Sequence, residues 1–209
     1  MRRSLLTAAG LALFASPAAF AGAAGGDPLN FLFLDANARA VAMGGAYTAL
    51  ATDANALLYN PAGLGAVERH EATFMHNEYF QGASQEYIGY ASPRGVGANV
   101  NSLRSGDVAR TTISNPDGTG LGGANLSDLS LALGYGRPLG DSLRLGAGMK
   151  YIRETIAGIS ASGYAADLGA LYSVPAARGL ALGLSVQNLG PSIKFQSAKE
   201  NLETLGRML

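Results

Sequence analysis

The chain has 209 residues, no cysteine, and 15 basic side chains balanced by 15 acidic ones. The balanced charge leaves no basic surface for nucleic acid, and the missing cysteine excludes disulfides and thiolate metal sites. Only 14% of the residues are charged and 29 are glycine, about twice the average glycine content. This composition suits a soluble all-β domain or a membrane barrel whose lipid-facing residues alternate with small ones.

The first 21 residues have the three parts of a secretory signal peptide. Arg2 and Arg3 give a positive start, residues 5–14 form an apolar run, and Ala19-Phe20-Ala21 is a small-x-small cleavage site. The apolar run is shorter than the ~20 residues that a membrane-spanning helix needs. We therefore expect an exported protein that is cleaved after Ala21.

Residues 22–66 differ from the rest of the chain, because they are rich in alanine and their apolar positions do not alternate. Gly44-Gly45 interrupts any long helix here. Asp53 is a candidate N-cap for a short helix over residues 54–59. Asn60-Pro61 ends that helix, because the residue before a proline is disfavoured in the α region. We expect two short helices and tight turns in one compact unit.

From residue 71 onward the apolar positions recur with period two, which indicates β-strands. The clearest strands carry leucine, methionine and tyrosine on one face and glycine, alanine and serine on the other. The strands expected from this alternation are residues 72–79, 85–92, 95–103, 129–136, 143–151, 164–172 and 180–187. Residues 115–125 suit a longer loop. The count is about seven strands, each near the ~10 residues of a tilted membrane strand.

The leucine face of these strands needs a cover. It could be the second sheet of a soluble exported β-sandwich that binds a partner, or the lipid around a barrel. The small residues on the opposite face and the tyrosines near the strand ends favour the barrel. If lipid covers the leucine face, arginine at Leu145 or Leu182 should be harmful, and serine at Gly183 should be milder.

Several motifs follow one another along the chain. The first group is Ala38-Arg39-Ala40, Met43-Gly44-Gly45-Ala46-Tyr47, Asp53-Ala54-Asn55-Ala56 and Tyr59-Asn60-Pro61-Ala62-Gly63. The second group is Tyr87-Ile88-Gly89-Tyr90, Gly148-Met149-Lys150-Tyr151, Asp167-Leu168-Gly169-Ala170 and Gln187-Asn188-Leu189-Gly190. In this order they resemble the PorV/PorQ family of outer-membrane proteins, which are relatives of the FadL-type fatty-acid transporters.

The resemblance implies an all-β fold: an antiparallel transmembrane β-barrel of roughly fourteen strands with a small N-terminal helical hatch in its lumen. The chain then divides into a signal peptide (residues 1–21), the hatch (residues 22–66) and the N-terminal half of a barrel (residues 67–209). We expect an incomplete barrel of about seven strands, as in a fragment. The expected hatch motif consists of Gly44, Gly45, Asp53, Asn60, Pro61, Ala62 and Gly63.

Three charged residues fall on the small-residue face of the strands: Arg144, Lys150 and Asp167. They should point into the lumen, either as solvated wall residues or as partners of the hatch. We favour the second interpretation, because the resemblance implies a plugged lumen. In that case Arg144 and Lys150 should meet Asp53 or the carbonyls at a helix end of the hatch.

The resemblance implies a protein of the outer membrane that is not an enzyme. It would serve protein secretion at the cell surface or the passage of hydrophobic small molecules. The expected partners are outer-membrane lipid, secretion-system components or a hydrophobic ligand, and no nucleic acid. We expect no catalytic residue, cofactor or metal. The two histidines, His70 and His76, would need added carboxylates to bind a metal.

Overall fold

The computed structural model describes residues 29–193, apart from residues 107, 110, 112, 121, 157, 178 and 192. The signal peptide expected over residues 1–21, the start of the hatch and residues 194–209 lie outside this range.

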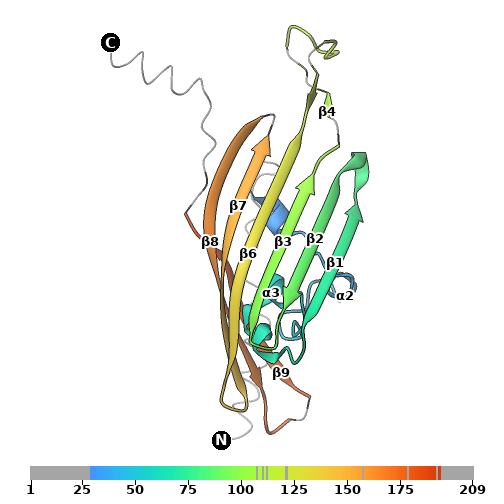
Figure 1. Ribbon diagram of the computed structural model, residues 1–209. Coiled ribbons are helices and arrows are strands. Elements are labelled where there is room, and N and C mark those ends of the chain that lie inside the picture. Colours follow the sequence, from blue (N-terminus) through green and yellow to red (C-terminus); the bar gives the residue numbers. More distant parts are fainter. Residues whose placement is uncertain are drawn as a thin grey trace, which may run out of the picture.

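The body of the protein is one curved, seven-stranded antiparallel sheet (Figure 1). Its strands, in spatial order, are β1 (Glu71–Glu78), β2 (Ser84–Ala91), β3 (Val96–Arg104), β6 (Leu126–Leu139), β7 (Leu143–Ile156), β8 (Ile159–Ser173) and β9 (Ala181–Leu189). This confirms the antiparallel sheet of about seven strands. The sheet is not closed, since β1 and β9 are its two edges, so closure into a barrel stays a prediction.

Strands β6, β7 and β8 are 14, 14 and 15 residues long, several residues more than the alternation predicts. Their extra length consists largely of polar residues such as Arg153, Thr155 and Ser160. Where both faces are polar the period-two signal disappears, although the backbone ladder continues. Two short strands, β4 (Val108–Ala109) and β5 (Gly123–Ala124), pair with each other; β5 falls within the loop expected over residues 115–125, and β4 precedes that loop.

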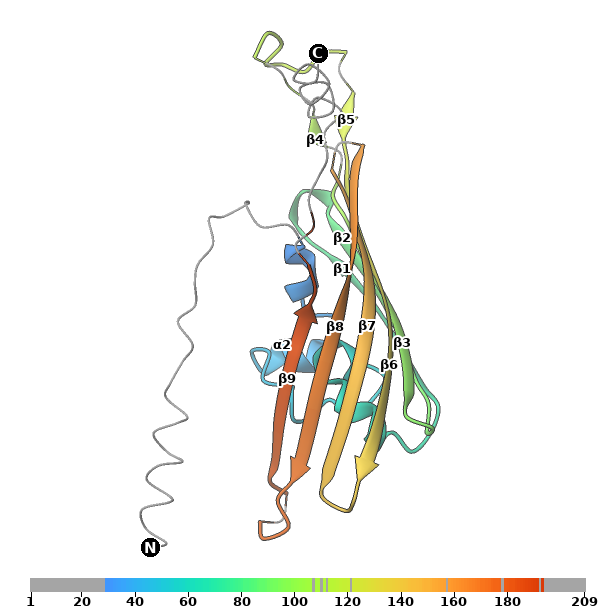
Figure 2. The same cartoon turned by 90° about the vertical axis from the view of Figure 1, so that its left-hand side faces the viewer.

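The helical unit predicted before residue 67 lies against one face of the sheet (Figure 2). Its elements are η1 (Asn30–Phe33), α2 (Ala38–Ala42), α3 (Ala56–Tyr59) and η2 (Pro61–Ala66). The Asn37 side chain caps α2 by accepting hydrogen bonds from two backbone amides. Gly44 and Gly45 follow with positive φ, a conformation that favours glycine. We call the residues from 29 to 66 the hatch unit, and the face it covers the inner face.

The second predicted helix ends at Tyr59 as expected, but it begins at Ala56, two residues late. The reason is that Asp53 forms a turn in place of a direct cap. Its Oδ1 accepts from the Asn55 amide at 2.9 Å, and its carbonyl accepts from the Ala56 amide at 2.9 Å. Such a local side-chain turn competes with the helix for the same backbone donors.

The inner face of the sheet is lined with glycines where the hatch unit touches it. Pairing across the strands aligns Gly97 with Gly134, Gly134 with Gly148, and Gly146 with both Gly136 and Gly169. A Cβ built on most of them would collide with the hatch unit. At Gly146 it would lie 2.3 Å from the Pro61 carbonyl carbon, and at Gly136 2.5 Å from the Pro61 oxygen. We call this set the glycine belt; its side-chain-free surface lets the hatch unit pack directly on strand backbone.

The contact between the glycine belt and the hatch unit can be tested with two matched glycine-to-alanine substitutions on β7. Gly146→Ala would press a methyl group against hatch backbone, so we expect a loss of about 1–3 kcal/mol in the free energy of unfolding. Gly148→Ala meets only the end of the Leu57 side chain, at 3.0 Å, and should cost clearly less. Denaturant titration measures both. Equal losses would show that the hatch unit does not rest on the backbone at Gly146.

Candidate functional site

Asn60 joins the hatch unit to the wall. Its side chain is fully buried. The carboxamide nitrogen donates to the Thr48 carbonyl at 3.0 Å and to the Ala170 carbonyl of β8 at 3.1 Å. The carboxamide oxygen accepts from the Ala62 amide at 3.1 Å, which starts η2. One residue of the predicted hatch motif therefore stops α3, caps the next helical turn and binds the sheet.

The rest of the predicted motif is brought together around this point. Pro61, Ala62 and Gly63 are buried in η2. A Cβ on Gly63 would lie 1.6 Å from the Ala51 carbonyl oxygen, so only glycine fits there without rearrangement. Gly44 and Gly45 stand apart, in the turn after α2, with nothing near their missing side chains. They shape the loop and do not touch the sheet.

Asp53 holds the hatch unit together from within. Its Oδ2 accepts from the Tyr47 hydroxyl at 2.8 Å, and the ring of Tyr47 lies edge-on to Tyr59, with 5.1 Å between centroids. Burial, followed by the bond to Asp53, raises the pKa of Tyr47 to about 12. Tyr47 therefore stays a neutral donor to Asp53 throughout the physiological pH range.

Lys150 and Asp167 form an ion pair on the inner face. Lys150 Nζ lies 2.9 Å from Asp167 Oδ2, and the side chains are 5% and 0% exposed. Lys150 also donates to Asn188 Oδ1 at 2.9 Å, and Asp167 Oδ1 accepts from the Asn188 amide at 2.8 Å. Asn188 has φ +58° beside the register shift between β8 and β9. The network thus fixes an irregular point in the sheet.

Two of the expected hatch contacts are wrong. Lys150 pairs with Asp167 on the next strand and not with Asp53, which is used inside the hatch unit. Arg144 lies on the inner face near a turn and makes a long contact with Ser173 Oγ, at 3.5 Å. Antiparallel register places Lys150 and Asp167 on adjacent strands close enough to pair, and the sequence alone carries no register.

Other inner-face contacts were not predicted. Gln187 on β9 donates to the Leu58 carbonyl of α3 at 2.8 Å. Glu154 Oε2 on β7 accepts from the Leu29 amide at 2.9 Å, which draws η1 toward the wall. There Phe31 packs with Ile152 in a buried apolar cluster. Residues 29–34 are mostly apolar, which predicts that they are buried. So short a run does not predict which part of the sheet they contact.

The opposite face, which we call the outer face, carries exposed apolar side chains. Leu133 and Leu184 are each 67% exposed, and Met149 is 66% exposed. On β7 the outward positions from Leu143 to Tyr151 are apolar, a stretch of about 27 Å along the strand at ~3.4 Å per residue. The other exposed members of this apolar band include Phe74, Ile88, Leu131, Leu145, Leu168, Leu182 and Val186.

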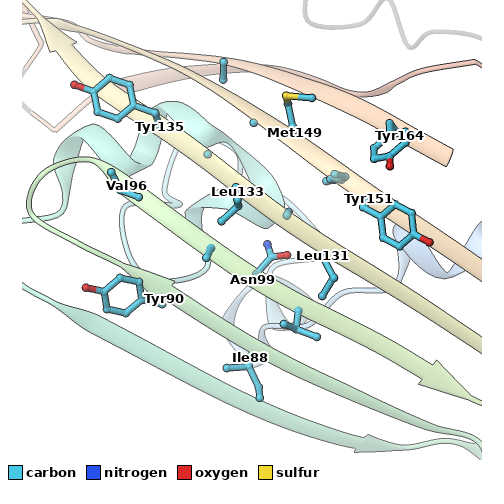
Figure 3. A pocket seen from close by; sticks show the side chains of 17 residues that line it. Ile88, Tyr90, Val96, Asn99, Leu131, Leu133, Tyr135, Met149, Tyr151 and Tyr164 are labelled. Carbon is cyan, nitrogen blue, oxygen red and sulfur yellow. The ribbon is translucent and has the colours of Figure 1, made fainter. Parts of the chain in front are cut away.

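A groove lies on the apolar band between four tyrosines (Figure 3). Tyr151 and Tyr164 pair across β7 and β8 with ring centroids 5.4 Å apart. Tyr90 and Tyr135 lie at the other end of the groove, which has a volume of about 930 Å³. Small outward residues such as Ala98 line it. The alternation predicts that tyrosines near the strand ends share the leucine face, but not which of them meet across strands.

The sequence model of an uncharacterised protein family, UPF0164, matches residues 10–132, more than half of the chain. The chain belongs to this family. The matched residues include the hatch unit, β1, β2, β3 and half of β6. No curated protein matches the chain.

Membership in UPF0164 assigns no activity to the chain. Within residues 29–193 as described, no helix is long and apolar enough to cross a membrane. The same residues hold no group of three or more side chains placed to bind a metal ion.

The buried ion pair can be tested by removing one partner at a time. Lys150→Met or Asp167→Asn should each cost about 3–5 kcal/mol, because a buried charge loses its partner. The double variant should lose less than either single variant, since it leaves no buried charge without its partner. Denaturant titration measures all three. Arg69→Met, at the exposed pair with Glu71, is the control and should change stability by no more than about 1 kcal/mol. Additive losses in the double variant would contradict the pairing.

Proposed function

We propose that the protein is an outer-membrane β-barrel protein of the PorV/PorQ type, related to FadL-type transporters, and that it is not an enzyme. The observation that carries the proposal is the division of one sheet into two unlike faces. Residues 29–66 cover the inner face through the glycine belt, while the outer face is a continuous exposed apolar band bordered by tyrosines.

Lipid suits the outer face better than water does. A monomeric soluble protein rarely exposes apolar side chains over an area that crosses a whole sheet. Membrane barrels, by contrast, place an apolar band about 25 Å tall between girdles of aromatic residues. The band on β7 has about this length, with Tyr151 and Tyr164 at one end and Tyr172, paired with Leu143, at the other. In the alternative, an exported β-sandwich, a second sheet or a partner protein would cover the same band.

The inner face supports the passage of hydrophobic small molecules more than a role in protein secretion. Phe31 packs on Ile152 and Ala165, and Leu29, Leu32, Leu34 and Leu103 adjoin them. This apolar patch lies beyond the point where η2 meets the glycine belt. An apolar chain that displaced Phe31 would find an apolar lining there. A pore that passes ions or sugars does not need an apolar lining.

A barrel in lipid also requires partners for both sheet edges, because unpaired backbone groups are not tolerated there. Seven antiparallel strands make β1 and β9 run in the same direction. An odd number of further strands would therefore have to lie between the two edges for every pairing to be antiparallel.

Arginine scanning tests whether the apolar band meets lipid. Leu145→Arg and Leu182→Arg should each destabilise the membrane-inserted protein by ~2–4 kcal/mol if the sites lie near the bilayer midplane. Ile113→Arg, in an exposed loop, is the matched control and should be nearly neutral. Refolding titrations into vesicles measure the effect. If all three variants refold equally well, lipid does not cover the band.

Gly183→Ser is unsuitable as the mild control that the sequence suggested. A Cβ at Gly183 would lie 2.7 Å from the Ala49 backbone of the hatch unit. The small residue is there to make room for that contact, and serine would disturb it.

Deleting residues 37–65 tests the plug. In a full-length protein whose barrel is closed, we expect the deletion variant to insert into liposomes and to leak small solutes, because the glycine belt would face an open lumen. Pro61→Ala should leak less, since it only loosens the turn between α3 and η2. Solute flux is the measurement, and the unaltered protein is the control. Wild-type flux in correctly inserted deletion protein would mean that the hatch unit does not plug the lumen.

A further inference from the structure

The outer face changes character abruptly just beyond Tyr151 and Tyr164. The row of paired residues Phe74, Ile88, Val100, Leu131, Tyr151 and Tyr164 is apolar or aromatic throughout. Two residues farther along the strands, Ser102, Leu129, Arg153 and Ser162 form the next row on β3, β6, β7 and β8. The row after it holds Arg104, Ser127, Thr155 and Ser160. The border of the apolar band is therefore sharp. It carries Arg104 and Arg153 on β3 and β7, and His76, Glu78 and Glu86 continue the same two rows on β1 and β2.

These polar rows contain a groove of their own, with a volume of about 540 Å³. Arg104, Arg153 and the hydroxyl residues Ser102, Ser127 and Thr155 line it, together with Leu126, Leu129 and Asp128. The register puts the two arginine Cα atoms two strands and one side-chain repeat apart, roughly 12 Å. Two long guanidinium side chains can converge on one anionic group across that distance. Bidentate recognition of phosphate is the geometry for which arginine is best suited.

Neither guanidinium is neutralised by a carboxylate within the part of the chain that the structure describes. Arg153 donates only to Ser160 Oγ, at 3.3 Å. Glu86, on the strand beside β3, is paired with His76 at 2.9 Å. Asp128 also lines the groove, but it is buried and, like Glu154, lies at an inner-face position of the alternation, with no ion pair to either arginine in the described part of the chain. The positive charge of Arg104 and Arg153 is therefore available to a ligand on the outer face.

The polar groove and the apolar groove lie side by side on β3, β6 and β7, in neighbouring rows of residues. The apolar groove between Tyr135 and Tyr151 lies on β3, β6 and β7, and the polar groove begins at the next row. An occupant that fits both has an acyl chain on Leu131 and Leu133 and an anionic headgroup at Arg104 and Arg153. An arginine just outside an aromatic girdle is where lipid phosphates lie.

We propose that Arg104 and Arg153, together with the adjoining apolar groove, form a binding site for one class of ligand, an anionic membrane lipid. This site rests on the proposed function, because it needs the apolar band to lie in lipid. It adds a lipid preference and a place on the barrel wall, on the face away from the hatch unit.

The chain has no tryptophan, so a single introduced one reports on its local lipid. Tyr164→Trp places the reporter at the border beside the polar groove, and Tyr172→Trp places a control reporter at the far end of β8. The protein is reconstituted in phosphatidylcholine vesicles with a minority of phosphatidylglycerol. Bromine is placed on the acyl chains of one lipid or of the other. The ratio of the two quenching efficiencies, corrected for mole fraction, measures which lipid is enriched at the reporter.

We expect phosphatidylglycerol to be enriched about five-fold or more at position 164 and not at position 172. Arg104→Gln together with Arg153→Gln should return the ratio at 164 to unity. Arg94→Gln, which removes the same charge in the turn between β2 and β3, should not. Loss of enrichment with Arg94→Gln, or no enrichment at 164 at all, would overturn the site.

Two further arms separate the possible failures. Inorganic phosphate at matched ionic strength should leave the ratio unchanged; displacement by phosphate alone would mean an anion site without a lipid role. If neither brominated lipid quenches Trp at 164 or 172, the apolar band is outside the bilayer and the proposed function itself fails. Equal quenching by both lipids overturns only the lipid site.

Discussion

The close approach of residues 60–65 to the backbone of β6, β7 and β8 is the contact on which the rest of the structure depends. A helical turn can lie on a sheet at this distance only where the strands carry no side chains, and the glycine belt supplies that surface. Asn60 then binds the hatch unit to the sheet, because its side chain donates a hydrogen bond to the Ala170 carbonyl of β8. The cost is that the inner face has few side chains of its own, so the hatch unit has to supply much of the core.

This arrangement explains why the sheet has such unlike faces. With much of the inner face filled by the hatch unit, Ile152, Leu171 and Tyr87 are buried on that face, while most of the exposed large apolar side chains of the strands lie on the outer face. There they pack on no other part of the described chain and form the exposed apolar band. A soluble protein would lose solubility with such a surface, whereas a bilayer requires it. The same alternation that makes the glycine belt therefore also makes the surface that suits lipid.

The charged side chains are also divided between the two faces of the sheet. The buried charges Lys150 and Asp167 neutralise each other on the inner face and hold the irregular backbone at Asn188. Arg104 and Arg153 lie on the outer face, beyond the tyrosines, where water and headgroups can solvate them. Placing a charge within the apolar band would cost several kcal/mol. On β6 the exposed Arg137 lies opposite Leu145 and limits the band on its other side.

Period-two alternation by itself determined the number of main strands, their approximate bounds and which side chains share a face. Asn60-Pro61 likewise determined where α3 ends, because those preferences are local. Register, pairing partners and distances were decided only by the tertiary structure. The sequence marks Gly146 as small, but not that Pro61 lies against it, and it marks Lys150 as inward, but not that Asp167 receives it. Such contacts join residues far apart in the chain, and their positions follow from the whole sheet being assembled around the hatch unit.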